Sequence, residues 1–136
     1  MARQLLAILT ILVLAACAGN QQQRERDSAV ERWEEAVRWS QQYDVLLDYI
    51  HPEWLAENPV SMLDINRLNQ FRVTEYRVRQ VVTDPDELGF QRVVQIRLYH
   101  VHTQRERVID HREVWRYDEN LERWLLHSGL PDPRRY

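Results

Sequence analysis

The stretch Phe90-Gln-Arg-Val-Val-Gln-Ile-Arg-Leu98 decides the fold, because apolar and polar residues alternate along most of its length. Successive side chains of a β-strand point to opposite faces, so this alternation predicts a strand with one buried face. The chain contains four β-rich runs, at residues 71–82, 90–102, 107–117 and 122–130. Short segments rich in turn-forming residues join these runs, which favours an antiparallel meander.

The positions of the turns predict how the strands pair. The turn residues predict three cross-strand pairs, which are Val82 with Phe90, His102 with Arg107, and Tyr117 with Glu122. Counting in twos from these pairs gathers apolar residues on one face of the sheet. The predicted inward set is Tyr76, Val78, Val82, Phe90, Val94, Ile96, Leu98, Ile109, Trp115, Tyr117, Trp124, Leu126 and Leu130. The same register places His100 opposite Ile109. It also makes Arg97 and Arg112 cross-strand neighbours.

We expect a helix to cover the apolar face of this sheet, because a single buried face needs a second layer. Ser28 and Glu31 form a capping box at the start of a helical period of apolar residues. The period ends at the His51-Pro52 pair, since a residue before proline avoids helical backbone. Residues 53–69 indicate short helical turns. The predicted fold class is α+β, an N-terminal amphipathic helix and short helical turns packed on a curved four-stranded antiparallel meander.

This arrangement resembles the nuclear-transport-factor-two-like, or cystatin-like, superfamily. The residues that carry the likeness are the amphipathic helix from Ser28, the meander, and the terminal pattern of Trp115-Arg-Tyr-Asp118, Trp124-Leu-Leu and Leu130-Pro131. The resemblance implies a cone, in which N-terminal helices fill a curved antiparallel sheet. It implies no single function, because this superfamily includes enzymes, binding proteins and assembly factors.

The first residues follow the pattern of a secretory signal peptide. Arg3 precedes an apolar stretch from Leu5 to Ala16, and small residues lead into the only cysteine of the chain. Roughly 20 apolar residues are needed to span a bilayer, so this stretch is too short to remain as a membrane-spanning helix. The motif Leu14-Ala15-Ala16-Cys17 resembles the bacterial lipoprotein signal. The resemblance implies removal of residues 1–16 and acylation of Cys17 with a diacylglyceryl group and a fatty acid such as palmitate.

The same resemblance implies a location. In such lipoproteins an aspartate directly after the cysteine is associated with retention in the inner membrane. This chain has Ala18 at that position, so we expect an outer-membrane anchor with the domain facing the periplasm. The alternative is an ordinary cleaved signal that ends at an incidental cysteine. Residues 17–27 are predicted to be the lipidated cysteine and a flexible polar tether. Residues 28–136 are predicted to form a single domain.

Composition narrows the classes of partner. All 18 basic residues are arginine, and the formal net charge is −3. This balance, together with an envelope location, argues against a nucleic acid. His100 and His102 have a spacing that could chelate a metal, but two histidines without a cysteine or an acidic cluster do not predict a metal site. The sequence contains no motif for a cofactor or a catalytic nucleophile.

Polar residues interrupt the predicted inward face, and they are the candidates for a pocket. They are Arg72, Thr74, His100, His102, His111 and Glu113. Among them His100, His111 and Glu113 could perform acid–base chemistry at the open end of a cone, which would give a small-molecule-binding or isomerase-like site. The alternative is that the strand ends emerge into solvent, while Glu113 and His111 bond the helix or Arg72.

The opposite face is rich in arginine. The residues predicted to bind a partner are Arg77, Arg79, Arg97, Arg112, Arg116 and Arg123, and His127 shares their face. Guanidinium groups suit carboxylates and phosphates, so we expect an anionic envelope component or an acidic protein as partner. The alternative is a solvated face with Glu75 and Asp110 interleaved. The sequence favours a non-enzymatic binding or envelope-assembly module and leaves the oligomeric state open.

Overall fold

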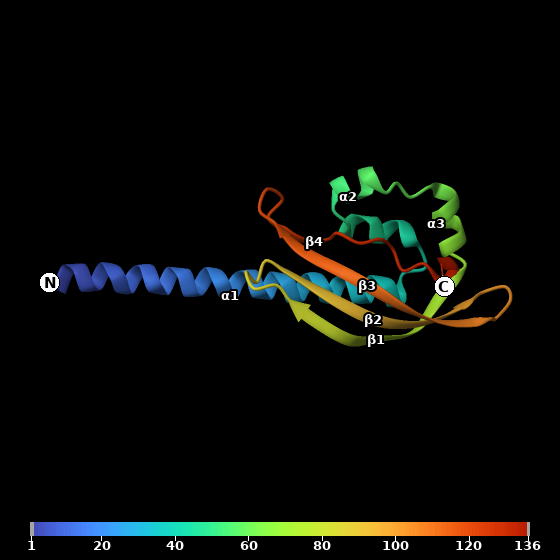
Figure 1. Cartoon of the computed structure of the whole chain (residues 1–136), viewed down its shortest axis with the longest axis horizontal. Coiled ribbons are helices and arrows are strands. Elements are labelled where there is room, and N and C mark those ends of the chain that lie inside the picture. The colour runs from blue at the N-terminus through green and yellow to red at the C-terminus, as the bar shows by residue number, and fades with distance from the viewer. Residues whose placement is uncertain (1, 136) are drawn as a thin grey trace.

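A computed structural model of the chain describes residues 2–135, with side chains from Gly19 to Arg134. Its elements are the helices α1 (Ala2–Trp39), α2 (Pro52–Glu57) and α3 (Met62–Leu68), the 3₁₀ helices η1 (Tyr43–Tyr49) and η2 (Pro133–Arg135), and the strands β1 (Phe71–Thr83), β2 (Gly89–His100), β3 (Glu106–Asp118) and β4 (Arg123–Leu126). The strands form one antiparallel sheet in the order β1-β2-β3-β4. The predicted α+β class is therefore confirmed (Figure 1).

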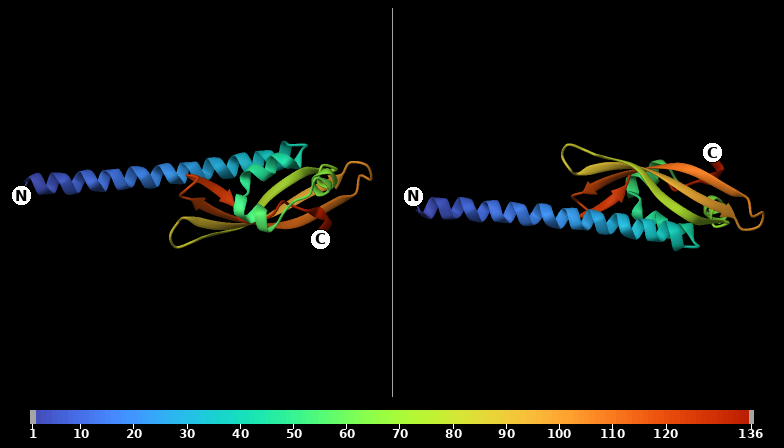
Figure 2. Two further views of the ribbon diagram at one scale, coloured as in Figure 1. Left: turned by 90° about the horizontal axis from the view of Figure 1, so that it is seen from above. Right: turned by 90° about the horizontal axis from the view of Figure 1, so that it is seen from below.

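The long helix covers one face of the sheet, and Figure 2 shows α1 lying along that face in both views. The core between the layers includes Trp33 of α1, Leu46 of η1 and Trp115 of β3, all at most 1% exposed. Trp33 and Trp115 meet edge to face, with their ring centroids 6.3 Å apart. The opposite face of the sheet is open over β1, β2 and β3, and most of the polar side chains predicted for it are exposed, whereas Leu125 of β4 is 1% exposed.

A buried carboxylate joins α1 to three strands. Glu113 of β3 is 0% exposed, and its Oε1 accepts hydrogen bonds from Trp33 Nε1 at 2.8 Å and from the Tyr76 hydroxyl. Its Oε2 accepts from Arg92 Nε at 2.8 Å and from Trp115 Nε1 at 3.1 Å. Arg92 also places its Nη2 2.7 Å from Oε2, so the buried negative charge has a buried positive partner. One side chain therefore binds α1, β1, β2 and β3 together.

The β2–β3 register differs from the predicted one by an even number of residues. Ile109 pairs with Ile96 instead of His100. The turn has the predicted length but occurs two residues earlier, because the His100 N–H bonds the carbonyl of Arg105 at 3.0 Å and Gln104 has a φ of 57°. Since side chains alternate with a period of two, an even shift leaves each residue on its predicted face. The shift does separate Arg97 from Arg112, which are not cross-strand neighbours.

Edge strand β1 contains a bulge, and the residues beyond it lie on the opposite face of the sheet from the predicted one. The register shifts between Val78 and Gln80, which leaves Arg79 as an extra residue in a bulge. Val82 then pairs with Gln91, and the exposed fraction of Val82 is 52%. Its predicted burial is wrong, because one extra residue exchanges the two faces beyond the bulge. Val81 takes the position toward α1.

Helix α1 begins earlier than predicted and includes residues 18–27. The sequence predicted a flexible tether there, and the structure corrects this to helix. Glutamine, arginine and glutamate are good helix formers, and Gln21 Nε2 donates to Glu25 Oε1 at 3.1 Å. The segment also contacts the sheet, since Trp124 Nε1 donates to the Gln22 carbonyl at 3.2 Å. No helix within residues 2–135 is long and apolar enough to cross a membrane.

The predicted helix over residues 28–50 is divided in the structure. Ser40 ends the regular helix, because its hydroxyl accepts from the Gln42 N–H at 3.1 Å and donates to the Gln42 carbonyl at 2.8 Å. The Tyr43 N–H then bonds the Asn69 side chain at 2.7 Å. The chain turns here, and η1 follows as a separate 3₁₀ helix.

We predict that Glu113→Gln lowers the free energy of unfolding by about 3–5 kcal/mol, because it leaves the buried Arg92 guanidinium without its counter-charge. Urea denaturation monitored by tryptophan fluorescence measures this loss. Glu75→Gln is the matched control, since Glu75 is a partly exposed carboxylate bonded to arginines and should cost less than about 1 kcal/mol. Equal small losses in both variants would contradict a central role for Glu113.

Candidate functional site

The three predicted pocket residues do not come together. His100 lies at the end of β2, eight residues beyond Arg92, the residue that pairs with Glu113. Each strand residue advances about 3.3 Å, so His100 and Glu113 lie about 25 Å apart. His100 Nε2 bonds Gln70 Oε1 at 2.9 Å, and its Nδ1 accepts from the His102 N–H at 3.2 Å. Its ring stabilises the β2–β3 turn.

Glu113 is fully engaged by donors, so neither oxygen is free to accept a proton from a substrate. The alternative that the sequence left open was that Glu113 and His111 bond the helix or Arg72. The Trp33 contact confirms it for Glu113, whereas no such bond of His111 is found among the described residues. Arg92 was not identified from the sequence. A signal for it was present, because an arginine at position 92 interrupts the apolar positions of the inward face. Burial and then the charge of Glu113 raise the pKa of the Tyr76 hydroxyl, which stays protonated in this network.

His111 stands alone in the core. It is 6% exposed, and its Nε2 has no hydrogen-bond partner among the described residues. Burial lowers the pKa of His111 below its usual value, and the charge of Glu113 only partly opposes this shift. A neutral histidine without a polar partner beside it is not an acid–base pair.

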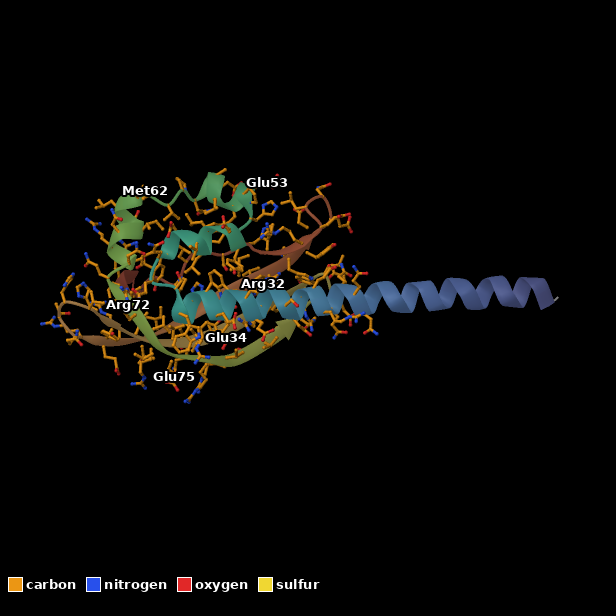
Figure 3. The ribbon with its side chains drawn as sticks, turned by 180° about the vertical axis from the view of Figure 1, so that it is seen from behind. Arg32, Glu34, Glu53, Met62, Arg72 and Glu75 are labelled. Atoms are coloured by element: carbon orange, nitrogen blue, oxygen red, sulfur yellow. The ribbon has the colours of Figure 1, made fainter. Side chains whose placement is uncertain are left out.

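Three of the six predicted arginines are occupied by contacts within the chain. Arg97 bonds Glu106 at 2.6 Å and Glu75 at 3.4 Å, and these carboxylates, Glu106 first, raise the pKa of Arg97. Arg77 bonds Glu75 at 2.5 Å. Figure 3 shows Glu75 on the side of β1 that faces away from α1. Arg123 donates from Nη2 to the Asp48 carbonyl at 2.9 Å.

The other three arginines, Arg79, Arg112 and Arg116, make no hydrogen bond or ion pair with another described residue. Arg79 occupies the bulge of β1. Arg112 and Arg116 lie on β3 and share its outward face with Val114, which stands between them. Both are exposed, so their guanidinium groups are available to a partner.

A pair of stacked histidines lies beside β3, where the His127 N–H bonds the Val114 carbonyl. The rings of His51 and His127 are 4.6 Å apart and inclined by 23°. His51 Nε2 bonds Asp118 Oδ2 at 2.8 Å, and its Nδ1 accepts from the Glu53 N–H at 3.2 Å as the N-cap of α2. The sequence did not predict this pair, because its members come from distant segments that meet only in the folded chain.

A groove of about 630 Å³ lies between α1, η1 and the β3–β4 turn. Its charged lining residues are Arg24, Arg32, Arg123, Glu25, Asp48 and Glu122. Because basic and acidic side chains are equal in number, the groove selects neither anions nor cations. The outward face around Arg112 and Arg116 has a clearer chemical preference.

We predict that the free energy of unfolding falls as the pH drops below about 6.5, because His111 binds a proton more weakly in the folded than in the unfolded chain. His111→Leu should remove part of this slope. Urea denaturation between about pH 5 and pH 7 measures it, with the exposed His102→Gln as control. An unchanged slope in His111→Leu would show that His111 takes up its proton inside the fold.

The fold is similar to the solution structure of a SEC-C motif-containing protein from Rhodopseudomonas palustris. The TM-score is 0.53 at 14% sequence identity, over 74% of this chain and 73% of that chain. At this identity the similarity concerns the fold alone. A scan against protein-family models finds no match, and a search of the curated proteins finds no match either.

Proposed function

We propose that this chain is a lipid-anchored envelope protein whose domain binds an anionic partner through the outer face of its sheet. The anchor is the acylated Cys17, which lies outside the residues whose side chains are described. The location is the outer membrane, with the domain on the periplasmic side. Support for the anchor comes from the motif Leu14-Ala15-Ala16-Cys17.

The observation that carries the binding role is the state of Arg112 and Arg116. Both are exposed on one face, and neither has an acidic partner in the described part of the chain. An arginine forms two parallel hydrogen bonds with a carboxylate or phosphate, which gives both strength and orientation. Arg77 of β1 and Arg97 of β2 already hold Glu75. The surface of contact is therefore centred on β3.

A binding role also agrees with the state of the inner face. The carboxylate most suited to acid–base work, Glu113, is enclosed by donors. The sheet has one covered face and one open face, and charged groups without partners lie on the open one. We therefore assign the partner to the open face.

The anchor is tested by replacing the acylated residue. Cys17→Ser should abolish incorporation of labelled palmitate and move the protein out of the outer-membrane fraction, because several acyl chains are needed for stable anchoring. Ala18→Ser, which keeps the cysteine, is the control and should behave as the native chain. Membrane retention of Cys17→Ser, or a native chain that takes up no label, would contradict the anchor.

The partner surface is tested by photocrosslinking in cells from Gln91, an exposed residue opposite Val114. A discrete product is expected, and the double variant Arg112→Glu/Arg116→Glu should reduce it by about ten-fold or more, since each charge-assisted hydrogen bond is worth about 1.5–3 kcal/mol. Arg77→Glu/Arg97→Glu carries the same change of net charge and should retain the product. Equal loss in both would indicate a general charge effect and contradict this surface.

A further inference from the structure

The open face carries a ring of polar side chains around Val114. Arg112 and Arg116 lie two residues to either side of it on β3. Gln91 pairs with Val114 from β2, and the His127 N–H bonds the Val114 carbonyl at 2.7 Å from the other side. Direct cross-strand neighbours lie about 5 Å apart and diagonal ones about 7–8 Å, so long side chains at these positions reach one another. Three cationic or protonatable groups therefore surround one small apolar residue.

The ring of His127 is held in place and left accessible. Trp124 and Leu126 are core residues of β4, so alternation directs His127 to the open face. One side of its ring stacks on His51. His51 is itself fixed beside β4, because its N–H bonds the Leu126 carbonyl at 2.8 Å. Neither nitrogen of His127 has a hydrogen-bond partner in the described chain, so both can serve a ligand.

The electrostatics of this position favour an added anion. The groups that act on His127 are His51, Arg116, Asp118 and Glu53, from β3 and the start of α2. Partial burial, then His51 and Arg116, lower the pKa of His127, while Asp118 and Glu53 oppose them. Asp118 is already engaged, since Oδ2 bonds His51 and Oδ1 accepts from the Leu121 N–H at 2.7 Å. A negative ligand beside Arg116 would offset the repulsion between Arg116 and protonated His127.

We propose that Arg112, Arg116 and His127 form one anion-binding cradle over Val114, which takes a phosphate group and binds it more tightly when His127 is protonated. The proposal rests on the proposed function, because it names the chemistry that the open face recognises. Arg112 and Arg116 flank Val114 along β3, and His127 lies across from it, so three donors can reach a ligand above Val114 from three sides. The terminal phosphate of a monoester offers a separate oxygen to each of three donors, whereas a planar carboxylate offers only two oxygens.

The cradle is tested with the full-length chain in micelles of a zwitterionic detergent. Inorganic sulfate is the first probe, because it has the shape of phosphate and keeps its charge between about pH 5 and pH 8, where histidine titrates. NMR of the imidazole carbon-bound protons follows His127, which is assigned by His127→Gln. We expect sulfate to shift the His127 signals, to raise their titration midpoint, and to bind about ten-fold more tightly at the acidic end.

Matched variants separate the contributions. His127→Gln should retain the affinity for sulfate at alkaline pH and lose its dependence on pH. Arg116→Gln should weaken binding at every pH, whereas Arg97→Gln, which alters an arginine already paired with Glu106, should leave it unchanged. Retained pH dependence in His127→Gln, or equal weakening by Arg97→Gln, would overturn the cradle.

Further probes distinguish the source of the phosphate group. Glycerol 3-phosphate represents soluble phosphate monoesters, and vesicles of phosphatidylcholine with phosphatidic acid represent lipid headgroups that carry a terminal phosphate. Displacement of sulfate by either supports the cradle and identifies its source, whereas displacement by acetate at similar concentration would overturn the choice of phosphate. If sulfate binds the purified protein but no crosslinked product forms in cells, the proposed function is contradicted and the cradle is not. If the crosslinked product forms in cells but sulfate does not bind the purified protein, the cradle is contradicted and the proposed function is not.

Discussion

The carboxylate of Glu113 is the constraint on which the rest of the structure depends. Removing a charge from water is unfavourable, and here the cost is offset by Arg92 and by neutral donors from two tryptophans and a tyrosine. These donors come from α1 and from three strands, so the geometry of the network specifies how the helix lies on the sheet. It also engages Tyr76 and Arg92, the polar side chains of the inner face that surround Glu113. On the proposed function, chemistry directed at a partner falls to the face that α1 does not cover.

Alternation along the strands was enough to predict the fold class and most of the core. The predicted register between β2 and β3 was wrong by four residues, yet Ile96 and Ile109 remained on the inner face because the error was even. The bulge at Arg79 is different, since one extra residue moved Val82 to the outer face. Nothing in the local pattern of β1 marks that residue, because its position depends on the fit of β1 to β2.

The site could be predicted in part. Arg112 and Arg116 were placed correctly on the outward face by counting in twos, but the supposed opposition of Arg97 and Arg112 depended on a register that the turn at Gln104 shifted. The stacking of His51 on His127 could not be predicted by counting residues along the strands. It requires the end of η1 to lie beside β4, and that contact arises from tertiary packing of residues with no local pattern in common.

Because α1 continues without a break through residues 18–27, it limits how far the domain can lie from the membrane. A helix rises about 1.5 Å per residue, so only about 8 Å of helix separates Cys17 from the Gln22 carbonyl that bonds Trp124. With acyl chains at Cys17, the domain would lie almost directly on the lipid surface, connected by a rigid helix and not by a flexible linker. It would have a preferred tilt and little reach. Any molecule that it captures would have to come within one domain length of the bilayer.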